Sequence, residues 1–197
     1  MHAHRSVVVF RYLFVPKDLK EFFSWAVSWA NVYIWSSAKV ERVESVVHKG
    51  FAGIFVNFSG WAGQQLCDVG TFCMGGGKPV FFKCLQNFLA VVQRYDVANV
   101  LLVDNSMYKC HFNPPGSYII VPGMEHRSSD YFSKDLKDFL TSWRDATDRP
   151  ACALSFKNAD STRDDKYVAT ALERGAKKTS YERYRKGPKL KPMLFRY

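Results

Sequence analysis

Five polar side chains of this sequence come soon after short apolar runs, and they comprise two hydroxyls, an ammonium, a carboxylate and an amide. They are Ser36, Ser37, Lys83, Asp104 and Asn105. Hydroxyls and ammonium groups donate hydrogen bonds to phosphate oxygens, whereas carboxylate and amide oxygens are suitable ligands of magnesium. In open α/β sheets, ligands bind beyond the carboxyl ends of the strands, which is where these side chains would stand. The residue types therefore predict a site for a phosphate group and a magnesium ion.

Each of these residues also has an ordinary structural role. A serine before a helix is a common N-cap, so capping is the alternative for Ser36 and Ser37. Most lysines are solvated on the surface, which is the alternative for Lys83 at the start of a helical pattern. Asp104 and Asn105 are also residues that close turns by bonding their own backbone. Only their meeting at one edge of a sheet favours the chemical interpretation.

The elements that must position these residues alternate between strands and helices. We expect strands at 6–15, 32–35, 51–58, 80–82, 100–103 and 118–121, and helices at 17–30, 38–48, 85–92 and 130–143. The run 100–103 lies between polar segments, a pattern typical of a strand buried on both faces. The segment 59–78 contains six glycines and no sustained period, so we expect an insertion loop there. The alternation predicts an α/β fold with a doubly wound, mainly parallel sheet.

The composition is that of a folded domain with a basic end. The chain has 197 residues, of which 47% are hydrophobic, and a formal net charge of +10. Residues 166–197 hold ten basic and two acidic side chains, so the preceding part is close to neutral. We expect one domain at 1–145 and a polar, then basic, tail at 146–197. This tail is the only part whose composition suits nucleic acid, and the alternative that we favour is a solvated tail without a partner.

Nothing in the sequence suggests a membrane segment. No apolar stretch approaches the roughly 18 residues that a membrane-spanning helix needs. The N-terminal apolar run is interrupted by Arg11, and no small-residue cleavage site follows it. The five cysteines form no C-x-x-C pair, which favours a reducing compartment. We therefore expect no membrane partner and an intracellular location, in the nucleus or the cytoplasm.

Three segments carry a resemblance to a known family. The stretch VLLVDNSMYK at 100–109, followed by Asn-Pro-Pro at 113–115, resembles the fourth motif of the C-terminal-domain phosphatase-like branch of the haloacid dehalogenase superfamily. VYIWSS at 32–37 resembles the second motif of that family, and KPVFFK at 78–83 resembles the third. The match spans about residues 10–142 in the family's order and is most similar to a plant-type subgroup.

The resemblance implies roles for the same five residues. Ser36 or Ser37 would bond the phosphate, and Lys83 would neutralise it. Asp104 with Asn105 would hold or orient magnesium, and the resemblance makes Lys83 and Asp104 catalytic residues as well. Met107 stands where the family usually has proline, which affects the geometry of the turn.

The family's nucleophile has no counterpart in this sequence. These phosphatases attack phosphate with the first aspartate of an Asp-x-Asp motif on their opening strand. No Asp-x-Asp occurs here, and the first acidic residue is Asp18. Two alternatives follow: either the segment 6–10 replaces the family's first central strand, or that strand is missing from this sequence.

Three functions remain as hypotheses. The first is a catalytically impaired phosphatase-fold protein that binds phosphorylated protein partners. The second is an active magnesium-dependent protein serine/threonine phosphatase whose nucleophile segment is absent from this sequence. The third is a component similar to a mitochondrial import receptor, since such a receptor uses a similar domain. We rank it last because the sequence shows neither a membrane anchor nor a targeting peptide.

Overall fold

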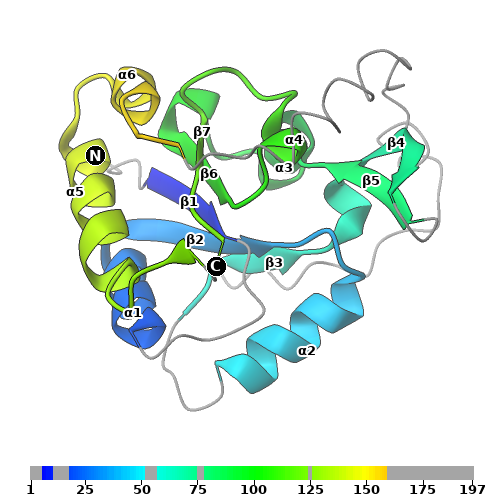
Figure 1. Ribbon diagram of the computed structural model, residues 1–197, viewed down its shortest axis with the longest axis horizontal. Helices are drawn as coiled ribbons and strands as arrows, with labels where there is room; N and C mark the ends of the chain where they lie inside the picture. Colours follow the sequence, from blue (N-terminus) through cyan, green and yellow to red (C-terminus); the bar gives the residue numbers. More distant parts are fainter. Residues whose placement is uncertain (1–5, 11–17, 52–56, 75–77, 124–125, 159–197) are drawn as a thin grey trace.

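The computed structural model describes residues 6–10, 18–51, 57–74, 78–123 and 126–158 (Figure 1). Helices and strands alternate through most of these residues. The strands form one larger sheet and one separate two-stranded pair. The α/β fold class expected from the sequence is therefore confirmed.

A five-stranded sheet with the order β3-β2-β1-β6-β7 forms the centre of the fold. Every neighbouring pair of strands in it is parallel. Its strands are β1 (Ser6–Phe10), β2 (Ala30–Trp35), β3 (Gly60–Ala62), β6 (Val100–Asp104) and β7 (Tyr118–Ile120). Because the strands are parallel, the residues that follow β2 and β6 leave the sheet at the same edge.

Strand β1 occupies the central position of this sheet. Val8 pairs with Val32 of β2 on one side and with Leu101 of β6 on the other. Of the two alternatives that the sequence leaves for this position, the structure has the segment Ser6–Phe10 in it. The rest of the strand expected at 6–15 lies outside the described residues.

Two hydrophobic clusters pack on the sheet, and successive strand residues alternate between them, as the two-residue period of a strand requires. In β2, Val32 and Ile34 belong to one cluster, whereas Tyr33 and Trp35 belong to the other. Strand β6 is buried along its whole length, as the apolar run predicts. Helices α1 (Leu19–Trp29), α2 (Val40–Gly50) and α5 (Lys137–Asp145) contribute to the first cluster, and α3 (Leu85–Val92) contributes to the second.

The helices follow the predicted patterns with shifted ends. In α1 the buried residues Leu19, Phe22, Phe23 and Ala26 recur at helical spacing, and the chain becomes extended at Ala30. The helix predicted at 38–48 runs from 40 to 50. The helix predicted at 130–143 begins instead with a π-helical turn, Phe132–Leu136, and continues as α5.

The segment between α2 and α3 departs most from the sequence-based expectation. Most of the strand expected at 51–58 lies outside the described residues, and the strand that pairs with β2 is β3, at Gly60–Ala62. The segment 59–78, which we expected to be an insertion loop, contains three regular elements instead. They are β3, a 3₁₀ turn at Gln64–Leu66 and strand β4 (Asp68–Met74). Strand β4 pairs with β5 (Lys78–Phe82) in the antiparallel second sheet. Short strands interrupted by glycine show no clear period, which is why the sequence pattern missed them.

The folded part extends past residue 145, the end of the domain expected from the sequence. Helix α6 (Arg149–Leu154) packs against α5 and β7, and the amide of Ile120 donates to Asn158 Oδ1 at 2.7 Å. Gly116 has a positive φ of 81°, and a Cβ there would lie 2.6 Å from the carbonyl oxygen of Pro150. The close approach of α6 therefore requires glycine at this turn. Residues 159–197, including the basic tail, lie outside the described residues.

Among the residues that the structure describes, no helix is both long enough and apolar enough to cross a membrane.

Candidate functional site

A buried ion pair lies at the carboxyl edge of the central sheet. The ammonium of Lys83 donates to Asp104 Oδ2 at 2.7 Å, and both side chains are 0% exposed. Lys83 follows β5, and Asp104 is the last residue of β6. The structure therefore brings together two of the five predicted site residues, and the alternative of a solvated surface lysine is wrong.

The same ammonium also reaches strand β2. Lys83 Nζ donates to the carbonyl oxygen of Trp35, the last residue of β2, at 2.7 Å. The charge also lies 5.7 Å from the centre of the Trp35 ring. An ammonium has three N–H donors, so these two hydrogen bonds leave one for a further acceptor. Lys83, which follows β5, thus connects the end of β5 to the ends of β2 and β6 through hydrogen bonds.

The two serines that follow β2 stand next to this point. The hydroxyl of Ser36 accepts a hydrogen bond from the amide of Ala38 at 3.2 Å, and the Ser36 amide donates to Ala62 of β3. The N-cap residue of α2 is Lys39, and no side chain caps that helix. The capping alternative for Ser36 and Ser37 is therefore wrong, and both hydroxyls stand in the loop between β2 and α2.

Asp104 acts both as an ion-pair partner and as a turn residue. Its Oδ1 accepts from the amide of Ser106 at 3.0 Å, while its Oδ2 faces Lys83. The next residue, Asn105, is exposed, and its Oδ1 accepts from the Ser106 hydroxyl at 3.4 Å. The turn leads into the short helix α4 (Met107–Cys110). The turn interpretation of the Asp-Asn pair is therefore confirmed for Asp104, and the site interpretation stays a prediction.

Asn113 fixes the backbone of Lys83, a role that the sequence-based analysis did not assign. Its Oδ1 accepts from the amide of Leu85 at 2.6 Å, at the start of α3. Its Nδ2 donates to the carbonyl oxygens of Lys83 at 2.7 Å and Cys110 at 2.9 Å. Asn113 opens the Asn-Pro-Pro triplet that forms part of the family resemblance, and this triplet is the signal by which it could have been found.

Lys109 is a second buried lysine near this edge, and it too was missed as a site residue. Its side chain belongs to α4, and the residue is 4% exposed. Its ammonium donates to the Ser106 hydroxyl at 3.4 Å, and its carbonyl oxygen accepts from the Lys83 amide at 2.7 Å. Lys109 stands in the VLLVDNSMYK stretch, but a lysine in a polar turn is ordinarily solvated, so its type alone gave no signal.

Cys67 lies on the apolar side of the site. Burial raises the pKa of this thiol to about 12, and the neighbouring Lys83 and Trp35 offset only part of that effect. The residue is 1% exposed. A thiol held in its protonated form is a poor nucleophile, so Cys67 does not suit nucleophilic catalysis.

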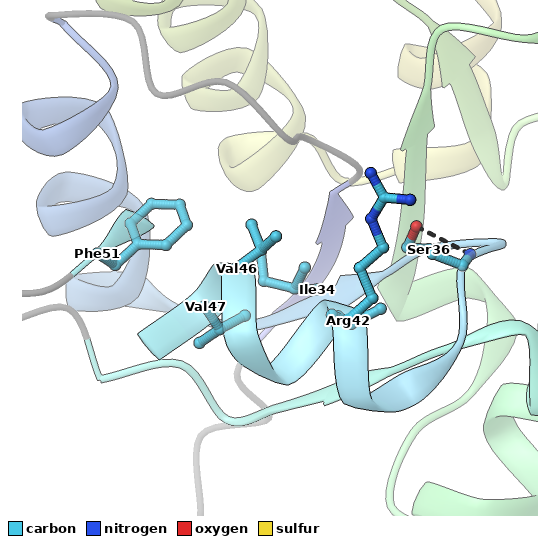
Figure 2. A pocket seen from close by; sticks show the side chains of 8 residues that line it. Ile34, Ser36, Arg42, Val46, Val47 and Phe51 are labelled. Carbon is cyan, nitrogen blue, oxygen red and sulfur yellow. Dashed lines mark hydrogen bonds between the residues drawn. The ribbon is translucent and has the colours of Figure 1, made fainter. Parts of the chain in front are cut away.

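A pocket opens beside Ser36, between β2 and α2, with an empty volume of about 300 Å³ that includes open solvent. Figure 2 shows the side chains of Ser36 and Arg42 at one end of the pocket and that of Phe51 at the other. The wall is mostly apolar and includes Ile34, Val43, Val46, Val47 and Phe51. Its chemistry suits an apolar group next to an anionic one.

The described residues show no assembled set of side-chain ligands for a magnesium ion. Among them, no three carboxylate, histidine or cysteine side chains come together as metal ligands. Asp104 presents one oxygen to the Lys83 ammonium and the other to the Ser106 amide, and a cation at 2.7 Å opposes a second cation on the same carboxylate. Asn105 alone would add a neutral amide oxygen.

A scan against protein-family models finds no family that matches this chain, and a search of curated proteins finds no matching relative.

Proposed function

We propose that this protein is a catalytically impaired member of the C-terminal-domain phosphatase-like branch of the haloacid dehalogenase superfamily, which binds phosphorylated protein partners. In this proposal the parallel sheet is the doubly wound sheet of that superfamily. The family resemblance of the three motifs supports it, together with the positions of their polar residues at the ends of β2, β5 and β6.

One observation carries the proposal: the ion pair of Lys83 and Asp104 at the edge where parallel strands end. A buried ion pair is costly to form, and well-packed apolar residues often stabilise a fold as well or better. Its position is the one where α/β proteins bind ligands. The remaining N–H of Lys83 and the hydroxyl of Ser36, the residue that follows Trp35, are donors that suit phosphate oxygens.

The central strand supports the impairment. Strand β1 lies between β2 and β6 and has the sequence SVVVF, and in this proposal it corresponds to the strand from which the family presents its nucleophile. No aspartate or glutamate follows it before Asp18, which stands at the start of α1 and accepts from the Ser133 amide at 3.2 Å. Without a carboxylate nucleophile, the rate of phosphate transfer falls by several orders of magnitude, whereas phosphate binding survives in part.

The pocket beside Ser36 supports a protein partner. An apolar side chain that neighbours a phosphorylated residue would lie against Val46 and Phe51, with Arg42 near the anionic end. Both Lys83 and Asp104 are fully buried, so a phosphate group reaches the ammonium only after neighbouring atoms move. We therefore expect association to be slower than that of a preformed open site.

Calorimetric titration with a phosphoserine peptide and its unphosphorylated form tests this function. We expect binding of the phosphorylated peptide alone, and no release of phosphate from it or from para-nitrophenyl phosphate in the presence of magnesium. The double variant Lys83→Met/Asp104→Leu removes both buried charges and keeps the packing volume, so it should fold but lose at least about tenfold in affinity. Lys134→Met, at an exposed lysine, serves as the matched control.

Two results would contradict the proposal. Equal binding of both peptides would show that the phosphate is not recognised. Magnesium-dependent turnover that Asp104→Ala abolishes would instead support the alternative of an active protein serine/threonine phosphatase.

A further inference from the structure

The described part of the chain buries more positive than negative charge. Its buried charged residues are Lys83, Asp104 and Lys109, which are 0%, 1% and 4% exposed. One carboxylate therefore stands against two ammonium groups. A buried charge is unfavourable unless an opposite charge or good hydrogen bonds compensate it.

Among these three residues, the charge of Lys109 has the weakest compensation by hydrogen bonds or opposite charges within the described part of the chain. Its ammonium makes one hydrogen bond within the described residues, to the Ser106 hydroxyl at 3.4 Å, and lies 5.2 Å from the centre of the Tyr108 ring. A distance of 3.4 Å is long for a charged donor, since such bonds usually measure about 2.7–2.9 Å. The side chain of Lys83, by contrast, holds two acceptors at 2.7 Å.

The two lysines belong to one site. The amide of Lys83 donates to the carbonyl oxygen of Lys109 at 2.7 Å, so their backbones are neighbours. Ser106 links the side chains, since its amide donates to Asp104 Oδ1 and its hydroxyl accepts from Lys109. Both ammonium groups therefore contact the turn that follows β6.

We propose that Lys109 is a second anion-binding residue, which with Lys83 holds the phosphate group of the partner without a divalent metal ion. The inference rests on the proposed function, whose phosphate site it specifies. A phosphate monoester carries a charge of about −1.5 to −2 at pH 7. The buried set of two ammonium groups and one carboxylate offers one net positive charge to it.

In this proposal, the two ammonium groups of Lys83 and Lys109 supply the positive charge that a divalent metal ion would otherwise supply. In a magnesium-dependent site the ion supplies the positive charge, and carboxylates hold the ion. Here Asp104 is engaged by Lys83 and Ser106, and the described residues contain no group of three metal ligands. The second lysine takes the place of the ion as the source of positive charge.

Calorimetric titration of the phosphoserine peptide in EDTA and in magnesium tests this inference. The wild-type protein should bind with the same affinity in both buffers, within about twofold. Lys109→Met, which keeps the length of the side chain, should weaken binding by about tenfold or more in both, because it removes a charge-assisted hydrogen bond. Lys109→Arg should retain most of the affinity, and Lys134→Met should match the wild type.

A melting curve of the free protein separates binding from a merely structural role. Because Lys109→Met removes a poorly compensated buried charge, the melting temperature of the unliganded variant should not fall below that of the wild type. A large fall, or unchanged affinity in this variant, would overturn the inference. Binding that requires magnesium would also overturn it while leaving the proposed function intact, whereas no binding in either buffer would overturn both.

Discussion

At the scale of single residues, the most demanding contact is the one between Lys83 and Asp104, because both side chains are fully buried. The sequence indicated that an ammonium and a carboxylate would lie at the sheet edge, since each follows an apolar run. It did not indicate that they would touch. That contact depends on where β5 ends relative to β6, and β5 belongs to a separate sheet whose partner strand was not predicted.

Removing one member of this pair should cost far more stability than removing both. Lys83→Met leaves the Asp104 carboxylate buried without its cation, and we expect a loss of about 3–5 kcal/mol in the free energy of unfolding. The double variant Lys83→Met/Asp104→Leu should recover most of that loss, because no charge remains buried. Urea unfolding of both variants measures this, and equal losses in the two would argue against a coupled pair.

Cys67 should make the free energy of unfolding decrease at alkaline pH. Burial raises the pKa of its thiol from 9.0 to about 12. The folded state then keeps the proton when the unfolded state has lost it, so this stabilisation is complete below pH 9 and is lost between pH 9 and about 12.

Cys67→Ala removes that dependence. The destabilisation caused by this substitution should be smaller at pH 10 than at pH 8 by about 1 kcal/mol, since one pKa unit corresponds to about 1.4 kcal/mol. Urea unfolding at the two pH values measures the difference. Cys152→Ala, at a less buried thiol, is the control, and a pH-independent effect of Cys67→Ala would contradict the expectation.

At the scale of elements, long periodic segments were predictable and short ones were not. The buried run of β6 and the helical spacing of α1 and α3 led to elements close to those in the structure. Strand β3 has three residues, and β4 contains Gly70, whose Cβ position would meet the Phe82 ring at 3.0 Å. Such strands form because partner strands supply their hydrogen bonds, which a local pattern does not record.

Asn113 should matter more than an ordinary helix cap. It satisfies the first amide of α3 and holds the carbonyl oxygens of Lys83 and Cys110, all in a buried position. Asn113→Ala leaves the Leu85 amide and the Lys83 carbonyl oxygen without this partner, whereas the Cys110 carbonyl oxygen keeps the backbone amide of residue 113; the change should cost about 2–4 kcal/mol in unfolding free energy. It should also weaken phosphopeptide binding, because the backbone of Lys83 loses its support.

A second capping residue provides the control for this prediction. Asp148 accepts from the Ala151 amide at 2.9 Å at the exposed start of α6, and Asp148→Ala should cost only about 1 kcal/mol. The affinity of the Asp148→Ala variant for the phosphopeptide should equal that of the wild type. Equal stability losses in the two variants would mean that Asn113 is a cap and nothing more.

At the scale of the whole molecule, the feature that the sequence predicts least well is the order of the strands in the central sheet. The alternation of elements predicted a parallel α/β sheet, but the occupant of its central position stayed open between two alternatives. The order β3-β2-β1-β6-β7 results from pairings between segments up to about ninety residues apart, and no local signal encodes them.

A proline in β1 should therefore unfold the entire sheet. Val8 pairs with strands on both sides, so Val8→Pro removes a ladder hydrogen bond at the centre of the fold. We expect loss of the cooperative unfolding transition in circular dichroism, whereas Val8→Ala should keep it. A cooperative transition in the proline variant would show that β1 is dispensable to the sheet.

The most direct test of the account is a crystal structure of the protein with a bound phosphoserine peptide. We predict phosphate oxygens about 2.7–2.9 Å from the ammonium groups of Lys83 and Lys109, with Ser36 facing the same group. A peptide bound elsewhere, with Lys83 still engaged by Trp35 and Asp104 alone, would contradict the proposal that this sheet edge is a phosphate-binding site.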